Sequence, residues 1–184
     1  MIVTLSIDHT GKPGRLSDRG AEDPGGVLTE VDFSARYVWI AESILRRAGI
    51  TVLVISSGAY KDRWALADQE GSKLYVSSHM NAGGGDRGEV YCDHRTSDKN
   101  GGELSRRIAT QLDMHVPWSV EAKPADGASR AFRCISGLKC IGIVYEPAFL
   151  DGPRGDLTEH IRAMGRGLAE GIISWAWYQS PGVP

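Results

Sequence analysis

The chain has 184 residues, of which 41% are hydrophobic and 24% are charged, and its formal net charge at pH 7 is −2. This size and composition are typical of a globular domain with one substantial core. The near-neutral charge gives no electrostatic reason to expect nucleic acid or an anionic membrane as a partner. No apolar run approaches the roughly 18 residues of a membrane-spanning helix.

Strand-like and helix-like segments alternate along the chain. This predicts an α/β fold, a single three-layer domain with a central, mostly parallel twisted sheet flanked by helices. The first helix should begin at the N-cap Thr29, whose spacing from Asp32 is that of a capping box, and end at Gly49. Strands are predicted at residues 2–7, 51–55, 73–78, 88–91 and 141–145, further helices at 61–71, 103–112 and 157–175, and irregular structure at 15–28 and 113–130.

The N-terminus and the cysteines bear on where the protein is made. Residues 1–8 contain no basic stretch and no small-residue cleavage pattern, so we interpret them as a strand and not as a signal peptide. Cys92, Cys134 and Cys140 form no CxxC pair. They are therefore interpreted as reduced thiols of a protein made in a cytoplasm.

Four polar residues lie at the edges of predicted elements, next to loops. His9 follows the first strand, His79 and Glu146 end two later strands, and Glu30 lies in the first turn of the first helix. In open α/β sheets, ligands bind in the crevice outside the carboxyl ends of the strands. Three of the four residues are therefore expected at one rim of the sheet, provided that their strands are parallel.

Two imidazoles and one carboxylate match the three protein ligands of a catalytic zinc ion, which keeps its fourth position for water. The metal lowers the pKa of that water to about 7 and polarises a carbonyl, while a further carboxylate transfers protons. The sequence contains no HExxH motif. The set of two histidines and two glutamates nevertheless meets the minimum for metal-assisted amide hydrolysis.

Each of these residues also has an ordinary structural interpretation when it is considered alone. A histidine after a strand, such as His9 or His79, is commonly a loop residue, and Glu30 is a first-turn acid of the kind that the helix dipole stabilises. Glu146 ends an apolar strand, where burial of a carboxylate without a partner would be costly. Only the joint occurrence of the four residues favours a metal site.

Four stretches together resemble the zinc-dependent N-acetylmuramoyl-L-alanine amidases of bacterial cell walls and phage endolysins. The resemblance covers nearly the whole chain, and its most specific part is a basic residue and a helical turn followed by a strand that leads into Ser-x-His-x-Asn-Ala. The stretches are IDHTG (residues 7–11), TEVDFSARYVWIAESILRRAGITVLVI (29–55), DRWALADQEGSKLYVSSHMNA (62–82) and IGIVYEPAFLDG (141–152).

The resemblance implies a role for each candidate residue. His9, Glu30 and His79 would bind one zinc ion per chain, and Glu146 would be the catalytic acid and base. The family usually separates its aspartate from the histidine by two residues, whereas Asp8 here directly precedes His9. Two further residues are expected in the substrate groove, Asn81 and Arg133.

The implied activity is hydrolysis of the amide bond between N-acetylmuramic acid and L-alanine of peptidoglycan. Two alternatives remain open from the residues alone. A zinc peptidase that cuts within the stem peptide would use the same metal chemistry with a different groove. A catalytically inert wall-binding module would keep the fold without the reaction, although all four functional positions carry competent residues.

The resemblance, together with the missing leader, favours a phage endolysin that lyses the host cell. We expect residues 1–184 to form one amidase catalytic domain without a separate cell-wall-binding domain. The protein would be made in the host cytoplasm without a signal peptide and would act on the wall or periplasm after release by a membrane-permeabilising partner, preferably in a Gram-negative host. It is expected to be a monomer that binds peptidoglycan, without nucleic acid and without stable membrane insertion.

Overall fold

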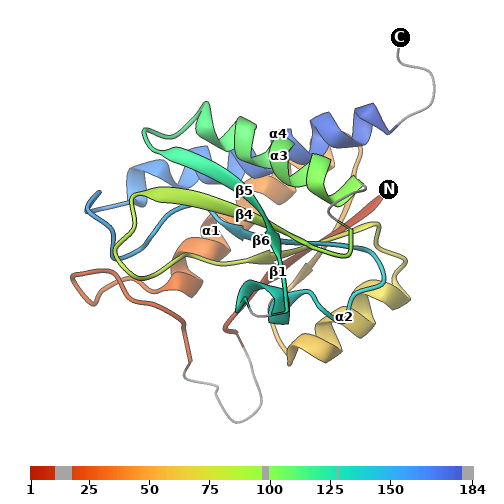
Figure 1. Cartoon of the computed structure of the whole chain (residues 1–184), viewed down its shortest axis with the longest axis horizontal. Coiled ribbons are helices and arrows are strands. Elements are labelled where there is room, and N and C mark those ends of the chain that lie inside the picture. The colour runs from red at the N-terminus through yellow and green to blue at the C-terminus, as the bar shows by residue number, and fades with distance from the viewer. Residues whose placement is uncertain (11–17, 97–99, 128, 180–184) are drawn as a thin grey trace.

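The structure, a computed structural model, describes residues 1–10, 18–96, 100–127 and 129–179. These residues form a six-stranded sheet in the order β2-β1-β3-β6-β4-β5 (Figure 1). Strands β2, β1, β3 and β6 are parallel, whereas β4 is antiparallel to β6 and β5 is parallel to β4. The strands are β1 (Ile2–Ile7), β2 (Thr51–Ile55), β3 (Leu74–Ser78), β4 (Arg87–Asp93), β5 (Ser119–Ala125) and β6 (Ile141–Glu146).

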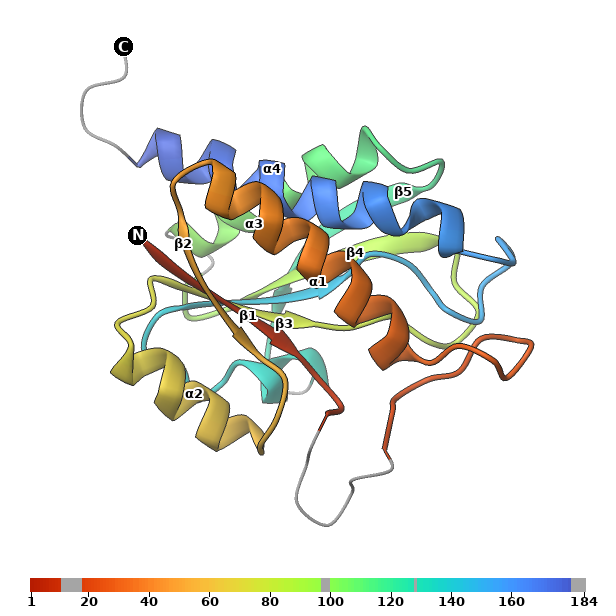
Figure 2. The same cartoon turned by 180° about the vertical axis from the view of Figure 1, so that it is seen from behind.

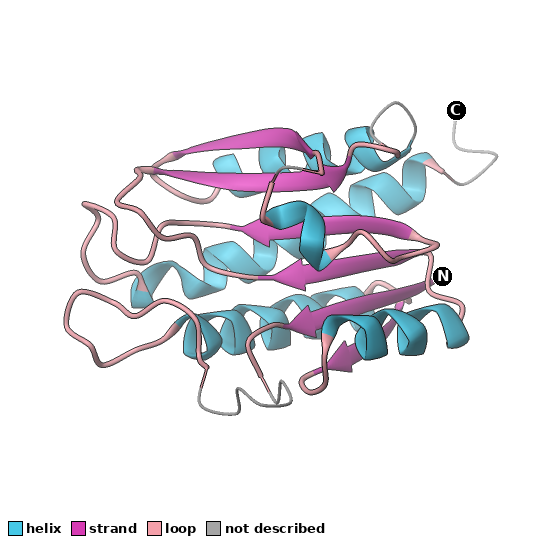
Figure 3. Ribbon diagram, turned by 60° about the horizontal axis from the view of Figure 1, so that its bottom comes forward, coloured by secondary structure: helices cyan, strands magenta, loops and turns pink. Residues whose placement is uncertain are grey.

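Helices cover both faces of the sheet, which confirms the predicted three-layer α/β fold (Figures 2 and 3). One hydrophobic cluster packs α1, α3 and α4 against one face, and a smaller one packs α2 and the 3₁₀ helix η1 against the other. No helix among the described residues is long and apolar enough to cross a bilayer. The helices are α1 (Glu30–Arg47), α2 (Tyr60–Gln69), α3 (Asn100–Asp113) and α4 (Ile161–Tyr178), with 3₁₀ turns η1 (Ala131–Cys134) and η2 (Thr158–His160).

Helix α1 begins where the capping box predicted. The Thr29 side chain accepts a hydrogen bond from the Asp32 backbone N–H, and the Asp32 carboxylate accepts one from the Thr29 backbone N–H at 2.9 Å. These two bonds satisfy N–H groups that have no partner within the helix. The capping box therefore places Glu30 at the first helical residue, where its side chain turns back toward the sheet.

The prediction of irregular structure over residues 113–130 is wrong for eight of them, the helical Asp113 and the seven residues of β5. Ser119–Ala125 forms β5, which pairs only with β4 at the edge of the sheet. Its residues are mostly exposed or half-buried, so the segment lacks the apolar alternation of a covered strand. Pro124 is tolerated because an edge strand has one side without ladder hydrogen bonds. The predicted loop over 15–28 lies partly outside the described residues.

Candidate active site

The carboxyl ends of three parallel strands meet at one rim of the sheet. His9 follows β1, His79 follows β3 and Glu146 is the last residue of β6. Register places these ends side by side, since Ser78 is opposite both Ile7 and Tyr145. The rim borders a cleft of about 950 Å³. All six residues predicted from the sequence line it: His9, Glu30, His79, Asn81, Arg133 and Glu146.

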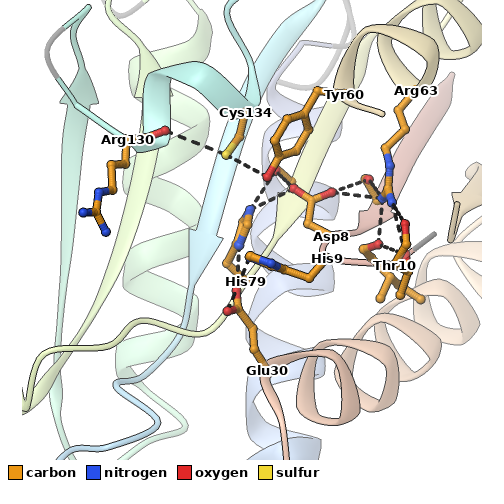
Figure 4. A network of polar contacts seen from close by, with 12 residues as sticks. Asp8, His9, Thr10, Glu30, Tyr60, Arg63, His79, Arg130 and Cys134 are labelled. Carbon is orange, nitrogen blue, oxygen red and sulfur yellow. Dashed lines mark hydrogen bonds and ion pairs between the residues drawn. The ribbon is translucent and has the colours of Figure 1, made fainter. Parts of the chain in front are cut away.

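His9, Glu30 and His79 form a cluster of possible metal ligands in this cleft (Figure 4). Each offers one ligand atom, and the three atoms lie within 4.8 Å of one another. His79 Nδ1 is 2.6 Å from Glu30 Oε1, and His9 Nε2 is 3.5 Å from Glu30 Oε2. Two imidazoles and one carboxylate, contributed by three separate elements, are the donor set of a catalytic zinc site.

The backbone around Glu30 brings its carboxylate to the histidines. Glu30 Oε2 accepts a hydrogen bond from the Ala21 N–H at 3.1 Å, and Oε1 accepts one from the Met80 N–H at 3.1 Å. Gly20 has φ +78°, and a Cβ at that position would lie 2.2 Å from Glu30 Oε2. The close approach of this loop therefore requires glycine.

The backbone at His9 is also unusual. Its φ is +60°, the only positive φ of a non-glycine residue among those that the structure describes. This left-handed turn directly after β1 brings the imidazole to within a ring-centroid distance of 5.3 Å from that of His79, edge to face. His9 Nδ1 lies 3.1 Å from Asp18 Oδ1, which leaves Nε2 directed at Glu30.

Asp8 occupies the other side of the His79 ring. Its Oδ2 lies 2.8 Å from His79 Nε2 and also accepts a hydrogen bond from Ser77 Oγ. Burial alone would lower the pKa of His79, but the charge and hydrogen bond of Asp8, with further hydrogen bonds to Cys134 and Glu30, raise that pKa well above its ordinary value. A His79 that donates its Nε2 proton to Asp8 has Nδ1 free to bind a metal, the arrangement common at metal-ligating histidines.

The buried guanidinium of Arg63 holds the loop that carries Asp8 and His9. It donates hydrogen bonds to the backbone oxygens of Ile7 and Thr10, at 2.7 and 2.5 Å, and to Asp8 Oδ1 at 3.1 Å. Arg63 is only 1% exposed. A side chain on α2 thus determines where the end of β1 places its functional residues (Figure 4).

Arg63→Met is expected to lower the free energy of unfolding by about 3 kcal/mol, because it removes the guanidinium that pairs with the buried Asp8 carboxylate and leaves His79 as the charged partner of that group. Urea denaturation of the metal-free protein measures this loss. Lys61→Ala, an exposed position on the same helix, is the matched control and should change stability by less than about 0.5 kcal/mol. Equal effects of the two substitutions would contradict the role of Arg63.

Two carboxylates face each other at the wall formed by β4 and β6. Glu89 and Glu146 are opposite residues of this antiparallel pair. Glu89 is held as an anion by Lys123 Nζ and Arg87 Nε, each 2.7 Å from Oε1, and by the hydroxyl of Tyr91, so its pKa falls to about 2 although the residue is buried. Burial and the nearby carboxylates Glu89 and Glu30 raise the pKa of Glu146 to about 7, against the opposing charge of His79. A carboxyl group with such a pKa can accept and return a proton near neutral pH.

The two predicted groove residues differ in their surroundings. The Asn81 side-chain amide donates a hydrogen bond to Glu89 Oε2 at 2.6 Å, so it supports the β4 wall as well as lining the cleft. Arg133 lies exposed on η1 and lines the cleft from the opposite side. The cleft therefore contains both, while their contact with a substrate stays a prediction.

The sequence reasoning missed Asp18 and Glu89, and it assigned no role to Asp8. Asp8 could have been noted as an acid directly after a buried strand, since a buried carboxylate needs partners. Asp18 lies in a loop and Glu89 in β4, an internal strand whose sequence alternates polar and apolar residues. Nothing in their sequence surroundings distinguishes them from solvated carboxylates.

Comparison with known proteins identifies a family model that matches the sequence and solved structures that share the fold. A family model described as N-acetylmuramoyl-L-alanine amidase matches residues 4–173. No curated protein matches the sequence.

Solved structures share the fold over nearly the whole chain. The N-acetylmuramoyl-L-alanine amidase from Clostridium difficile 630 has a TM-score of 0.82 at 19% identity, with 97% of this chain and 98% of that one covered. The N-acetylmuramoyl-L-alanine amidase AmiC2 of Nostoc punctiforme has a TM-score of 0.79 at 18% identity, with 96% of this chain and 97% of that one covered. The catalytic domain of the CD27L endolysin, which targets Clostridia difficile, has a TM-score of 0.75 at 17% identity. The match covers 95% of this chain and 97% of that one.

Proposed function

Because the chain belongs to the N-acetylmuramoyl-L-alanine amidase family, we propose that it hydrolyses peptidoglycan as a zinc-dependent enzyme with His9, Glu30 and His79 as metal ligands. The bond cut is the amide between the lactyl group of N-acetylmuramic acid and L-alanine. The observation that carries the proposal is the convergence of the three ligand atoms within 4.8 Å, in a cleft that also contains Glu146.

The chemistry of the donor set fits zinc. His9, Glu30 and His79 offer two imidazole nitrogens and one carboxylate oxygen within 4.8 Å of one another, and these residues would hold the ion. The buried Asp8 carboxylate at His79 Nε2 and the Asp18 carboxylate at His9 Nδ1 orient the two rings toward Glu30. Bound zinc supplies a Lewis acid that polarises the scissile carbonyl and lowers the pKa of water.

Glu146 is the residue assigned to proton transfer. Its carboxylate accepts the proton of the attacking water and then gives it to the nitrogen of L-alanine as the amide bond breaks. Burial and the neighbouring carboxylates raise the pKa of Glu146 to about 7 in the metal-free protein, which favours a group that both accepts and returns a proton near neutral pH. Lys123, Arg87 and Tyr91 keep the neighbouring Glu89 ionised, so that the proton resides on Glu146.

Peptidoglycan digestion with and without a zinc chelator tests this function. We expect free stem peptides that begin at L-alanine, identified by mass spectrometry, to disappear with chelator and to return when zinc is added. Zinc is expected to be required because none of the described residues that line the cleft has a side chain that acts as a comparable Lewis acid. The measurement is the rate of release of new amino ends from purified sacculi.

The other outcomes identify the alternatives. New ends inside the stem peptide would make the protein a zinc peptidase with the same metal site. Sedimentation with sacculi without any cleavage would make it a wall-binding module. Cleavage at full rate after complete removal of zinc would contradict the assignment of His9, Glu30 and His79 as catalytic metal ligands.

The biological role that we propose is lysis of a bacterial host by a phage endolysin that acts on the wall after its release from the cytoplasm. Similarity to an endolysin catalytic domain supports this role at the level of the fold, which bacterial amidases share. We propose that the active form is a monomer. Production in Gram-negative cells should cause lysis only when a membrane-permeabilising protein is produced with it. Intact cells under that condition, with active enzyme in the extract, would contradict the role.

A further inference from the structure

The two ring nitrogens of His79 face two different sets of possible metal ligands (Figure 4). Nδ1 points to Glu30 and belongs with His9 to the site described above. Nε2 points to the opposite side, where it meets Asp8 and the thiol of Cys134. The ligand atoms of Asp8, His79 and Cys134 also lie within 4.8 Å of one another.

The second set is buried at the base of the cleft. Asp8 is 1% exposed, His79 7% and Cys134 8%. His79 and Cys134 both line the cleft, whereas Asp8 does not and its side chain is fully buried, so a cation would reach the set from the cleft through the first two residues. Cys134 is a free cysteine on η1, and its thiol lies 3.3 Å from the hydroxyl of Tyr60, which belongs to α2. Three separate elements therefore hold the donors in place.

The donors of the second set differ from those of the first in one respect that matters for metals. A thiolate is a soft ligand, and together with imidazole and carboxylate it favours zinc or a softer divalent cation such as cadmium. The set of His9, Glu30 and His79 contains no sulfur. A thiophilic ion in excess over the catalytic zinc therefore has a separate place to bind.

We propose that Asp8, His79 Nε2 and Cys134 form a second metal site that binds a thiophilic divalent cation, either excess zinc or cadmium, and through which such ions inhibit the enzyme. Binding forms bonds to sulfur, nitrogen and oxygen, and it releases the thiol proton and the Nε2 proton to solvent. The hydrogen bond from His79 Nε2 to Asp8, which orients the ring for the first site, is lost in the process. The inhibitory part of this proposal rests on the proposed amidase function, whereas the binding part does not.

Cadmium titration of protein loaded with one equivalent of zinc tests the binding. Cadmium bound to a thiolate gives a charge-transfer absorption in the ultraviolet, which coordination by nitrogen and oxygen alone does not give. We expect this band at one cadmium per chain in the wild type and its loss in Cys134→Ser and in Cys134→Ala. The two variants guard against a misfolded protein, and far-ultraviolet circular dichroism checks each.

Cys140→Ser is the matched control. Cys140 is half-buried and free, but it precedes the first residue of β6, at the strand end opposite to Glu146, so it should not contribute to the band. The band should therefore remain in this variant. Its absence from the wild type, its persistence in both Cys134 variants, or its loss in Cys140→Ser would each overturn the second site.

Inhibition by excess zinc tests the consequence for activity. Each protein is compared with its own rate at one equivalent of zinc, and the zinc concentration that halves the rate should rise at least about tenfold in Cys134→Ser. An equal concentration for both proteins would overturn the inhibitory role. A cadmium band in a protein that cleaves no peptidoglycan would leave the second site intact and remove the proposed function, so the two failures are distinguishable.

Discussion

Replacing Glu146 with glutamine is expected to lower the rate of peptidoglycan hydrolysis by about 10²–10⁴-fold, the usual contribution of a general acid–base residue. Glutamine keeps the shape of the side chain but cannot accept the proton of water at neutral pH. Zinc content should stay at the wild-type level, because Glu146 does not belong to either set of clustered metal-ligand atoms. Release of amino ends from sacculi and metal analysis of the purified variant measure the two effects.

The same substitution should stabilise the metal-free protein at alkaline pH. The pKa of Glu146 is about 7 in the folded protein, above the ordinary 4.5, so its ionisation opposes folding. This destabilising contribution is absent below the unfolded pKa and complete above the folded one. Because Glu146 is only half-buried, we expect Glu146→Gln to raise the free energy of unfolding by about 2 kcal/mol at pH 8 and by nothing at pH 4, measured with urea in the presence of chelator.

Glu159→Gln is the control for both measurements. Glu159 lies on η2 with its side chain 80% exposed, so neither the rate nor the stability should depend on its charge. A wild-type rate in Glu146→Gln would reject the catalytic role. Loss of zinc from that variant would show that its defect lies in the metal site, and a stability gain that is equal at pH 4 and pH 8 would contradict the raised pKa.

Replacing His79 with alanine should remove the metal and destabilise the fold together. The variant loses one of three zinc ligands, so its affinity for zinc should fall by more than the roughly 100-fold typical of losing an outer partner of a ligand. It also leaves the carboxylates of Asp8 and Glu30 facing the vacated space, with no imidazole between them. We expect a loss of about 3 kcal/mol in the free energy of unfolding of the metal-free protein.

His115→Ala is the matched histidine control. His115 pairs with Glu170 at 2.8 Å, and neither residue lines the cleft. Competition with a zinc-binding dye measures affinity, and urea denaturation measures stability. A His79→Ala protein that binds zinc as tightly as His115→Ala would reject His79 as a ligand, whatever its effect on activity.

Much of the candidate site was predictable from the sequence because its residues follow strong local signals. His9, His79 and Glu146 each come at the end of a buried apolar run, and parallel strands bring their carboxyl ends to one rim. Glu30 follows an N-cap whose capping box fixes the start of α1 within one residue. Hydrophobic periodicity and capping depend on residues that are close together in the sequence, so both can be identified from the sequence alone.

The strand β5 shows where such local reasoning fails. Its alternation is weak because the strand lies at the edge of the sheet and pairs with only one neighbour, β4. Pro124 then resembles a loop signal, although an edge strand accepts it. Whether a polar segment of seven residues becomes a strand depends on the strand with which it pairs in the folded protein. The sequence of the segment does not identify that neighbouring strand.

The sequence by itself determined the α/β class, the parallel rim and six of the residues that line the cleft. Only the tertiary structure decided how the polar groups behind the rim are paired: Arg63 on Asp8, Asp8 on one nitrogen of His79, and Cys134 beside both. These contacts join residues separated by about 55 to 126 positions, and their strength depends on distance and burial, which a linear pattern does not contain.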